Sequence, residues 1–202
     1  MRAPARLFLA SSNPGKLAEY RELAAATPLL IELALLPDFG ALPAFEENAP
    51  TFAENAAGKA LYYSRLREGL VFADDSGLVV PSLGGAPGVH SARYAGPQAT
   101  NAQKIEKLLV EMRGKARTER AAYFVCAIAL AERGRAMAIM TDRVDGEILE
   151  APRGARGFGY DPVFYFPTLQ KTFAEISAEE KNLRSHRGKA FRRFLAALSS
   201  ML

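Results

Sequence analysis

A long β-rich stretch between residues 120 and 148 constrains the fold more than any other feature of the chain. Arg120–Leu130 is rich in β-branched and aromatic residues, and the turn sequence Glu132–Arg135 leads directly into a second such run, Ala136–Ile148. Two strands joined by so short a turn must pair antiparallel. An all-parallel sheet is therefore excluded, and we predict a mixed α/β fold, with α+β character, around a twisted sheet with flanking helices.

Shorter apolar runs predict further strands around this hairpin. Strands are expected at Arg6–Ser11 and Leu29–Leu36. Leu70–Ala73 is expected to be a short strand that ends at the turn residues Asp74–Gly77, after which Leu78–Pro81 could pair back as a hairpin arm.

Helix signals separate these strands. Asn13 suits an N-cap with Pro14 at the first helical position, and Thr51 forms a capping box with Glu54. Ser177 is a similar cap near the C-terminus. Apolar residues at helical spacing predict two more helices, marked by Ile105, Leu108, Leu109 and Met112 and by Phe191, Phe194, Leu195 and Leu198.

Length and composition describe an ordinary globular protein. The chain has 202 residues, of which 49% are apolar, and we expect one domain spanning residues 1–202. The single cysteine, Cys126, excludes a disulfide framework and a multi-cysteine zinc site. Leu7–Ala10 is too short for a signal-peptide core, and Ala121–Ala131 is too short to span a bilayer. We therefore expect a cytoplasmic protein with no membrane partner.

The charge balance raises the question of a nucleic-acid partner. The formal net charge is +4 and the sequence pI is about 9.3, in the range of nucleic-acid binders. Residues 1–150, however, carry 17 basic and 18 acidic side chains, whereas residues 151–202 carry 9 and 4. The positive surplus is confined to the last quarter of the chain, which disfavours a nucleic-acid-binding surface.

The Ser11–Lys16 turn is a candidate anion site. A strand that leads into a helix N-terminus presents N–H groups and the positive end of the helix dipole, where phosphate binds readily. Lys16 adds a charge, and Ser11, Ser12 and Asn13 add short polar side chains. The turn lacks the Walker A pattern. The alternative is an ordinary, well-capped connection.

Carboxylates gather in two places. Asp74 and Asp75 are adjacent at the end of an apolar strand, where they could hold Mg²⁺ or accept a proton from water. Glu46 and Glu47 become interesting as a second carboxylate source for a metal shared with Asp75. The alternatives are an acidic β-turn for the aspartates and solvated surface for the glutamates.

The C-terminal quarter adds aromatic and basic candidates. Phe158 and Tyr160 lie beside glycines and could stack on a flat base, although core packing is the commoner fate of such residues. Lys181, His186 and Arg187 form a basic cluster that is either a ligand clamp or a solvated helix face. A phosphate cradle, metal carboxylates, an aromatic shelf and a basic clamp together suit a Mg²⁺-nucleotide.

Six motifs carry a family resemblance. They are SSNPGK (11–16), TFAENAAGKA (51–60), FADDSGL (72–78), GGAPGVHSARYAG (84–96), GFGYDP (157–162) and SHRGKAF (185–191). In this order and over most of the chain, they resemble the inosine-triphosphate pyrophosphatase family, the non-canonical purine nucleoside-triphosphate pyrophosphatases, in its bacterial form.

The resemblance implies Mg²⁺-dependent hydrolysis of ITP, dITP and XTP to the monophosphate and pyrophosphate, which cleanses the nucleotide pool. It implies a homodimer and an elongated two-lobed fold with the active site in the cleft. It also implies that Asp75 ligates metal and accepts the water proton. The implied substrate-binding residues are Ser11, Ser12, Asn13, Pro14, Gly15, Lys16, Ser76, Phe158, Gly159, Tyr160, Asp161, Lys181, His186 and Arg187.

One departure from the family leaves a ligand open. Family members often have Glu-Glu-Thr-Gly before the Thr-Phe pair, whereas here Asn48, Ala49 and Pro50 follow the two glutamates. Glu46, Glu47 or neither could therefore share the metal with Asp75.

As a mechanism we expect Asp75, or Asp74 beside it, to take the water proton, while Lys16 and Lys59 stabilise charge on the phosphates. Lys181, His186 or Arg187 could donate to the 6-oxo group of the base. A non-catalytic Mg²⁺-nucleotide sensor and a triphosphatase of different base specificity are the alternatives.

Overall fold

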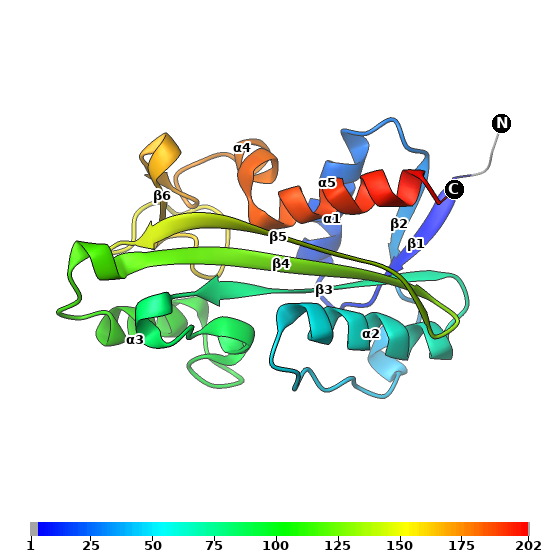
Figure 1. Cartoon of the computed structure of the whole chain (residues 1–202), viewed down its shortest axis with the longest axis horizontal. Coiled ribbons are helices and arrows are strands. Elements are labelled where there is room, and N and C mark those ends of the chain that lie inside the picture. The colour runs from blue at the N-terminus through cyan, green and yellow to red at the C-terminus, as the bar shows by residue number, and fades with distance from the viewer. Residues whose placement is uncertain (1–3, 202) are drawn as a thin grey trace. The chain divides into compact units, whose positions relative to one another are not determined.

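The computed structural model describes residues 4–201, and residues 1–3 and 202 lie outside the described part (Figure 1). Its strands form one seven-stranded sheet in the order β2-β1-β3-β4-β5-β6-β7. The strands are β1 (Ala5–Leu9), β2 (Ile31–Leu35), β3 (Leu70–Val79), β4 (Ala121–Glu132), β5 (Arg135–Ile148), β6 (Phe164–Phe166) and β7 (Lys171–Thr172). The α-helices are α1 (Pro14–Ala25), α2 (Phe52–Leu66), α3 (Asn101–Glu111), α4 (Ala178–Arg184) and α5 (His186–Ser199).

The sheet is mixed. β1 pairs in parallel with β2 and with β3, whereas β6 pairs antiparallel with β5 and with β7. The predicted hairpin is present as β4 and β5, joined by Arg133 and Gly134, whose φ angles are 48° and 73°. Two left-handed residues give the turn whose twist matches that of the flanking strands. The predicted mixed α/β class is confirmed.

The chain divides into two compact units. Unit 1 comprises the residues up to 75, residues 126–142 and the residues from 187 on, and unit 2 comprises residues 76–125 and 143–186. Each unit consists of separate stretches of the chain. The chain passes from one unit to the other at four points, and three of these points lie within β3, β4 and β5. One domain over residues 1–202 stays a prediction.

In unit 1, strand alternation divides the core between the two faces of the sheet. Phe72 of β3 and Ile128 of β4 pack with apolar residues of α1 and α5. Val71 and Ala73 of β3, with Ala127 of β4, pack with α2. Figure 1 shows α1 and α5 on one face and α2 on the other. This alternation continues along β3 and fixes where its next side chains point.

Unit 2 has a core of its own. Ile105, Leu108 and Met112 of the predicted amphipathic helix pack against strand residues and against a group of aromatic side chains that includes Phe164 and Phe173. The short strands β6 and β7 were not predicted from the sequence. Among residues 4–201, no helix is both long and apolar enough to cross a bilayer.

The prediction for residues 70–81 is wrong. In place of a short strand, a turn and a hairpin arm, β3 runs without interruption from Leu70 to Val79 through Asp74–Gly77. The strand lies between β1 and β4, and helices supply partners for both aspartates, so sheet pairing outweighs the turn preference of Asp and Gly.

Candidate active site

The two aspartates of β3 lie on opposite faces of the sheet. Asp74 follows the alternation of Phe72 and contacts residues of α1 and α5, whereas Asp75 follows that of Ala73 and contacts α2. Both carboxylates are buried, at 1% and 8% exposure. Since the segment is a strand, these adjacent residues belong to two separate clusters with different chemistry.

The Asp74 cluster consists of Lys16, Glu19, Asp74 and Arg187. Lys16 Nζ donates to Asp74 Oδ1 at 2.8 Å, and Arg187 Nη1 donates to Glu19 Oε2 at 2.7 Å. Arg187 Nε lies 3.6 Å from Asp74 Oδ2 and so links the two pairs. Two cations face two carboxylates, and the formal charges balance.

This balance shows in the pKa of Asp74. Burial alone would raise that pKa, but the charges of Lys16, Arg187 and Lys59 outweigh burial and hold it well below its usual range. Asp74 therefore stays ionised, which suits a group that anchors cations and does not suit a proton acceptor.

The Asp75 cluster consists of Glu47, Asn55, Lys59 and Asp75. Asn55 Nδ2 donates to Asp75 Oδ2 at 3.0 Å, and Lys59 Nζ forms a hydrogen-bonded ion pair with Glu47. Lys59 Nζ also donates to the backbone oxygen of Asp74 at 3.2 Å. One ammonium here faces two carboxylates, so this cluster carries surplus negative charge.

Burial and this surplus charge together raise the pKa of Asp75. Burial and then the charge of Glu47 raise it to about 6, against the hydrogen bond from Asn55 and the charge of Lys59. A carboxylate with a pKa close to neutral can hold and release a proton under physiological conditions. Of the two predicted proton acceptors, Asp75 has the suitable environment.

The Ser11–Lys16 turn has the predicted local structure. Asn13 caps α1, its Oδ1 accepting from the backbone nitrogens of Gly15 at 2.9 Å and Lys16 at 3.3 Å, and Pro14 is the first helical residue. Ser11 Oγ accepts from the nitrogen of Asn13 at 3.0 Å. The cap side chain thus already occupies two of the amides expected to meet an anion, and the exposed Ser12 lies beside them.

In unit 2, Lys181 and Asp161 form a buried ion pair within the predicted aromatic and basic group. Asp161 Oδ2 also accepts from the backbone nitrogen of Phe158 at 2.8 Å. The Phe158 ring is 51% exposed, and the ammonium of Lys181 lies 4.5 Å from its centroid. The adjacent Gly159 has a φ of 62°. This arrangement holds an accessible aromatic face in a fixed place.

Other residues of this group are in the core. Tyr160 is 4% exposed, and its hydroxyl donates to the backbone oxygen of Ser91 at 2.9 Å. His186 is buried, and its ring stacks on Phe124 with centroids 4.8 Å apart. Lys181 and Arg187 are buried too, so the solvated helix face considered for this cluster is wrong for its three basic members. Ser76 lies half-buried on β3.

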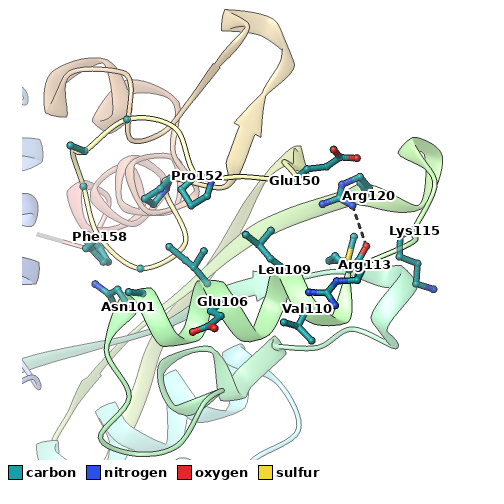
Figure 2. Close-up of a pocket in the computed structure, with 18 of the residues that line it drawn as sticks. Asn101, Glu106, Leu109, Val110, Arg113, Lys115, Arg120, Glu150, Pro152 and Phe158 are labelled. Carbon is teal, nitrogen blue, oxygen red and sulfur yellow. Dashed lines mark hydrogen bonds between the residues drawn. The ribbon is translucent and has the colours of Figure 1, made fainter.

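A separate pocket of about 950 Å³ lies in unit 2, along α3 and the glycine-rich loop that follows β5. Figure 2 shows Phe158 at one end of it, and Arg113, Lys115 and Arg120 toward the other. Arg120 donates to the backbone oxygens of Met112, Ile148 and Leu149 and so braces the backbone. Of the predicted site residues, only Phe158 and Gly159 line this pocket.

The comparisons with known proteins decide the family. The sequence profile of the Ham1 family matches residues 7–197. The chain belongs to the Ham1 family. The dITP/XTP pyrophosphatase of Geobacillus kaustophilus is 50% identical over 184 residues, 91% of this chain and 89% of that protein. The dITP/XTP pyrophosphatase of Gloeobacter violaceus is 48% identical over 193 residues, 96% of this chain and 94% of that protein.

A solved structure supports the same assignment. A HAM1 protein from Coxiella burnetii has a TM-score of 0.86 and 40% sequence identity, over 97% of this chain and 99% of that chain. The family membership that the six motifs predicted is therefore confirmed, and so is the fold class.

The Asp75 cluster has chemistry that suits a divalent cation. Its surplus negative charge lies on the carboxylate oxygens of the buried Asp75 and the half-buried Glu47, and carboxylate oxygens are ligands that Mg²⁺ prefers. Among the described residues no three His, Cys, Asp or Glu side chains form a metal-holding group. Mg²⁺ is often held by only one or two carboxylates, together with waters and substrate phosphates. The residues present therefore fit this ion.

Two residues of these clusters were missed in the sequence analysis. Asn55 belongs to a Ham1 motif, TFAENAAGKA, but received no role. A polar amide in a helix interior, followed by the buried residues Ala56 and Ala60, was the available signal. Glu19 gave a weaker one, since it follows Lys16 by three residues on α1.

Proposed function

We propose that this chain hydrolyses the non-canonical purine nucleoside triphosphates ITP, dITP and XTP to the monophosphate and pyrophosphate. The observation that carries the proposal is the Asp75 cluster of a Ham1 chain, where a buried carboxylate has a pKa of about 6 beside surplus negative charge. The names of the relatives with about 50% identity give the substrate class.

Asp75 and Glu47 are assigned as the groups that hold Mg²⁺. Glu47 contributes to the electrostatics of Asp75, whereas the exposed Glu46 accepts from the side chain of Asn48 at 2.9 Å. We therefore choose Glu47 over Glu46. When bound, Mg²⁺ supplies charge neutralisation on the phosphate oxygens and on the pyrophosphate leaving group.

The chain's own residues supply the remaining chemistry. Asp75 accepts the proton of the attacking water, an assistance typically worth about 10²–10⁴-fold in rate. Lys59 and Lys16 stabilise charge on the phosphates. Asp74 fixes the Lys16 ammonium at the N-terminal end of α1, where Ser11, Ser12 and Asn13 complete the triphosphate-binding turn.

Base recognition is assigned to unit 2. The exposed ring of Phe158 offers a stacking face, and Lys181 and His186 are the donors we assign to the 6-oxo group of hypoxanthine or xanthine. The amino group of adenine cannot accept from such donors. Sites built for one polar group discriminate by roughly 10⁴–10⁵. Arg187 pairs with Glu19 and Asp74, so we place it with the phosphate-binding groups.

We further propose that the chain acts as one domain, as a cytoplasmic homodimer, on a small-molecule substrate rather than on nucleic acid or a membrane. The family resemblance and the near-neutral first 150 residues support this proposal.

The test is a panel of nucleoside triphosphates with Mg²⁺, scored for pyrophosphate against orthophosphate. We expect pyrophosphate from ITP, dITP and XTP and little turnover of ATP, whose 6-amino group cannot accept from these donors, with Asp75→Asn as the inactive control. Binding without turnover would support the nucleotide-sensor alternative. Orthophosphate release, or preference for another base, would overturn the assignment.

A further inference from the structure

Asn55 has an unusual position for an amide side chain. It lies within α2 and is 0% exposed. A buried amide must be hydrogen-bonded, and Asn is disfavoured within helices because its side chain competes for the backbone. The apolar residues Ala56, Ala60 and Tyr63 of α2 are buried beside it in the core. Packing alone does not account for Asn55.

Three hydrogen bonds fix the Asn55 amide. Its Oδ1 accepts from the backbone nitrogen of Ala49 at 2.9 Å, and its Nδ2 donates to the backbone oxygen of Ala49 at 3.3 Å. The same Nδ2 donates to Asp75 Oδ2 at 3.0 Å. Because one bond uses the oxygen and two use the nitrogen, the orientation of the amide is fully determined.

The hydrogen bonds of Asn55 connect two segments that are far apart in sequence, the loop at Ala49 and the strand at Asp75. Ala49 follows Glu47 by two residues, so the amide that orients Asp75 also holds the loop that carries Glu47. Within residues 4–201, Asn55 is the only side chain hydrogen-bonded to the Asp75 carboxylate. That bond uses Oδ2, and Oδ1 accepts no hydrogen bond from a side chain within the same range.

We infer that Asn55 is a positioning residue. It holds the Asp75 carboxylate and the loop that carries Glu47 in the relative positions that the reaction requires. The inference rests on the proposed function, since it assigns Asn55 a part in the same site. Asn55 acts through Asp75 and Ala49 and does not itself contact the reacting atoms.

Two variants separate the hydrogen bonds. Asn55→Asp keeps an oxygen that can accept from the Ala49 amide but removes both bonds that Nδ2 donates, to Asp75 Oδ2 and to the backbone oxygen of Ala49. Asn55→Ala removes all three bonds. For both, we expect kcat for dITP to fall about 10²-fold or more, the scale of a misplaced reacting group. KM should stay within about threefold, because no substrate contact is removed.

Hydrogen exchange at the Ala49 amide gives a readout that does not depend on activity. Asn55→Ala should speed that exchange at least about tenfold, because the amide loses its acceptor. Asn55→Asp should leave it protected. A slow Ala49 amide in a poorly active Asn55→Asp variant would show that turnover depends on the bonds donated by Nδ2, of which the one to Asp75 is the only one that reaches the carboxylate.

Ser64→Ala is the matched control. Ser64 lies on the same helix, is 2% exposed, accepts from the backbone nitrogen of Gly134 at 3.0 Å and donates to the oxygen of Leu61 at 3.1 Å. Its loss should leave kcat and Ala49 exchange unchanged. Equal losses of kcat in Ser64→Ala and Asn55→Ala would overturn the inference, as would wild-type kcat in Asn55→Asp. Wild-type pyrophosphate release, measured in the same series, tests the proposed function separately.

Discussion

Asp74 and Asp75 are neighbours in sequence and both buried, yet they differ in the face of the sheet they occupy, in their charged partners and in their pKa. On the α1–α5 face, two cations and two carboxylates form ion pairs, and the pKa of Asp74 lies well below its usual range. On the α2 face, one ammonium faces two carboxylates, and the pKa of Asp75 rises to about 6. The comparison teaches that charge balance, rather than burial, separates a carboxylate held ionised from one whose pKa lies near neutral.

The largest expected effect is on turnover at the Asp75 face. Asp75→Asn keeps the size and an acceptor for Asn55 but cannot take a proton, so kcat should fall about 10²–10⁴-fold. Pyrophosphate release from dITP under saturating Mg²⁺ measures it. Near-wild-type turnover would remove Asp75 from the mechanism and would break the contrast between the two faces.

The next effect is on stability at the Asp74 face. Asp74→Asn removes the carboxylate that pairs with Lys16 and Arg187, and breaking a buried charge pair typically costs about 3–5 kcal/mol. Urea unfolding of the metal-free protein measures it. The control is Asp38→Asn, because Asp38 is exposed and forms only a surface pair with Arg67, which is worth less than about 1 kcal/mol. A loss no greater than in that control would contradict the assignment.

The two aspartates should also give opposite pH dependences. The folded pKa of Asp75 is about 6, above its unfolded value, so its contribution to stability is present below about pH 4 and lost as the pH rises to about 6. The loss is about 3 kcal/mol, from about 1.4 kcal/mol for each pKa unit. Asp74 has a lowered pKa, so its contribution is present above about pH 4 and lost only in strong acid.

Free energies of unfolding measured in EDTA at two pH values test these opposite pH dependences. Relative to wild type, Asp75→Asn should gain stability between pH 4 and pH 7.5, whereas Asp74→Asn should lose stability at both values. A gain that is independent of pH in Asp75→Asn would show that its folded carboxyl has an ordinary pKa.

The smallest effect distinguishes the two glutamates. Glu47→Gln should raise the Mg²⁺ concentration for half-maximal activity about tenfold, the lower end of the losses seen when groups that tune a metal site are removed. Glu46→Gln should leave it within about twofold, because Glu46 is exposed and bonds only to Asn48 among the contacts that the structure gives it. A larger effect in Glu46→Gln than in Glu47→Gln would assign the metal ion to Glu46 instead of Glu47.

The sequence predicted most of the elements because their signals are local. Asn13, Thr51 and Ser177 cap helices as expected, and the apolar spacing from Phe191 to Leu198 marks the buried side of α5. The motifs also identified the family. Residues 70–81 were mispredicted because the turn preference of Asp and Gly is a local signal, whereas β3 is determined by partners distant in sequence.

The same reason explains what was missed in the candidate site. Without the strand, the alternation that sends Asp74 and Asp75 to opposite faces could not be applied, so the two appeared as one acidic pair. Lys181 and Arg187 were ambiguous because their buried partners, Asp161 and Glu19, lie 20 and 168 residues away. Spacing along the chain carries no information about such pairs.

The position of α5 has a consequence for synthesis. Phe191, Phe194 and Leu198 fill the core of unit 1 beside Leu7 and Leu9 of β1, so the first and last parts of the chain close the same core. Many proteins fold from the N-terminus while still on the ribosome. In this chain, the face of β1 that packs against α1 and α5 stays incompletely covered until α5 has been synthesised.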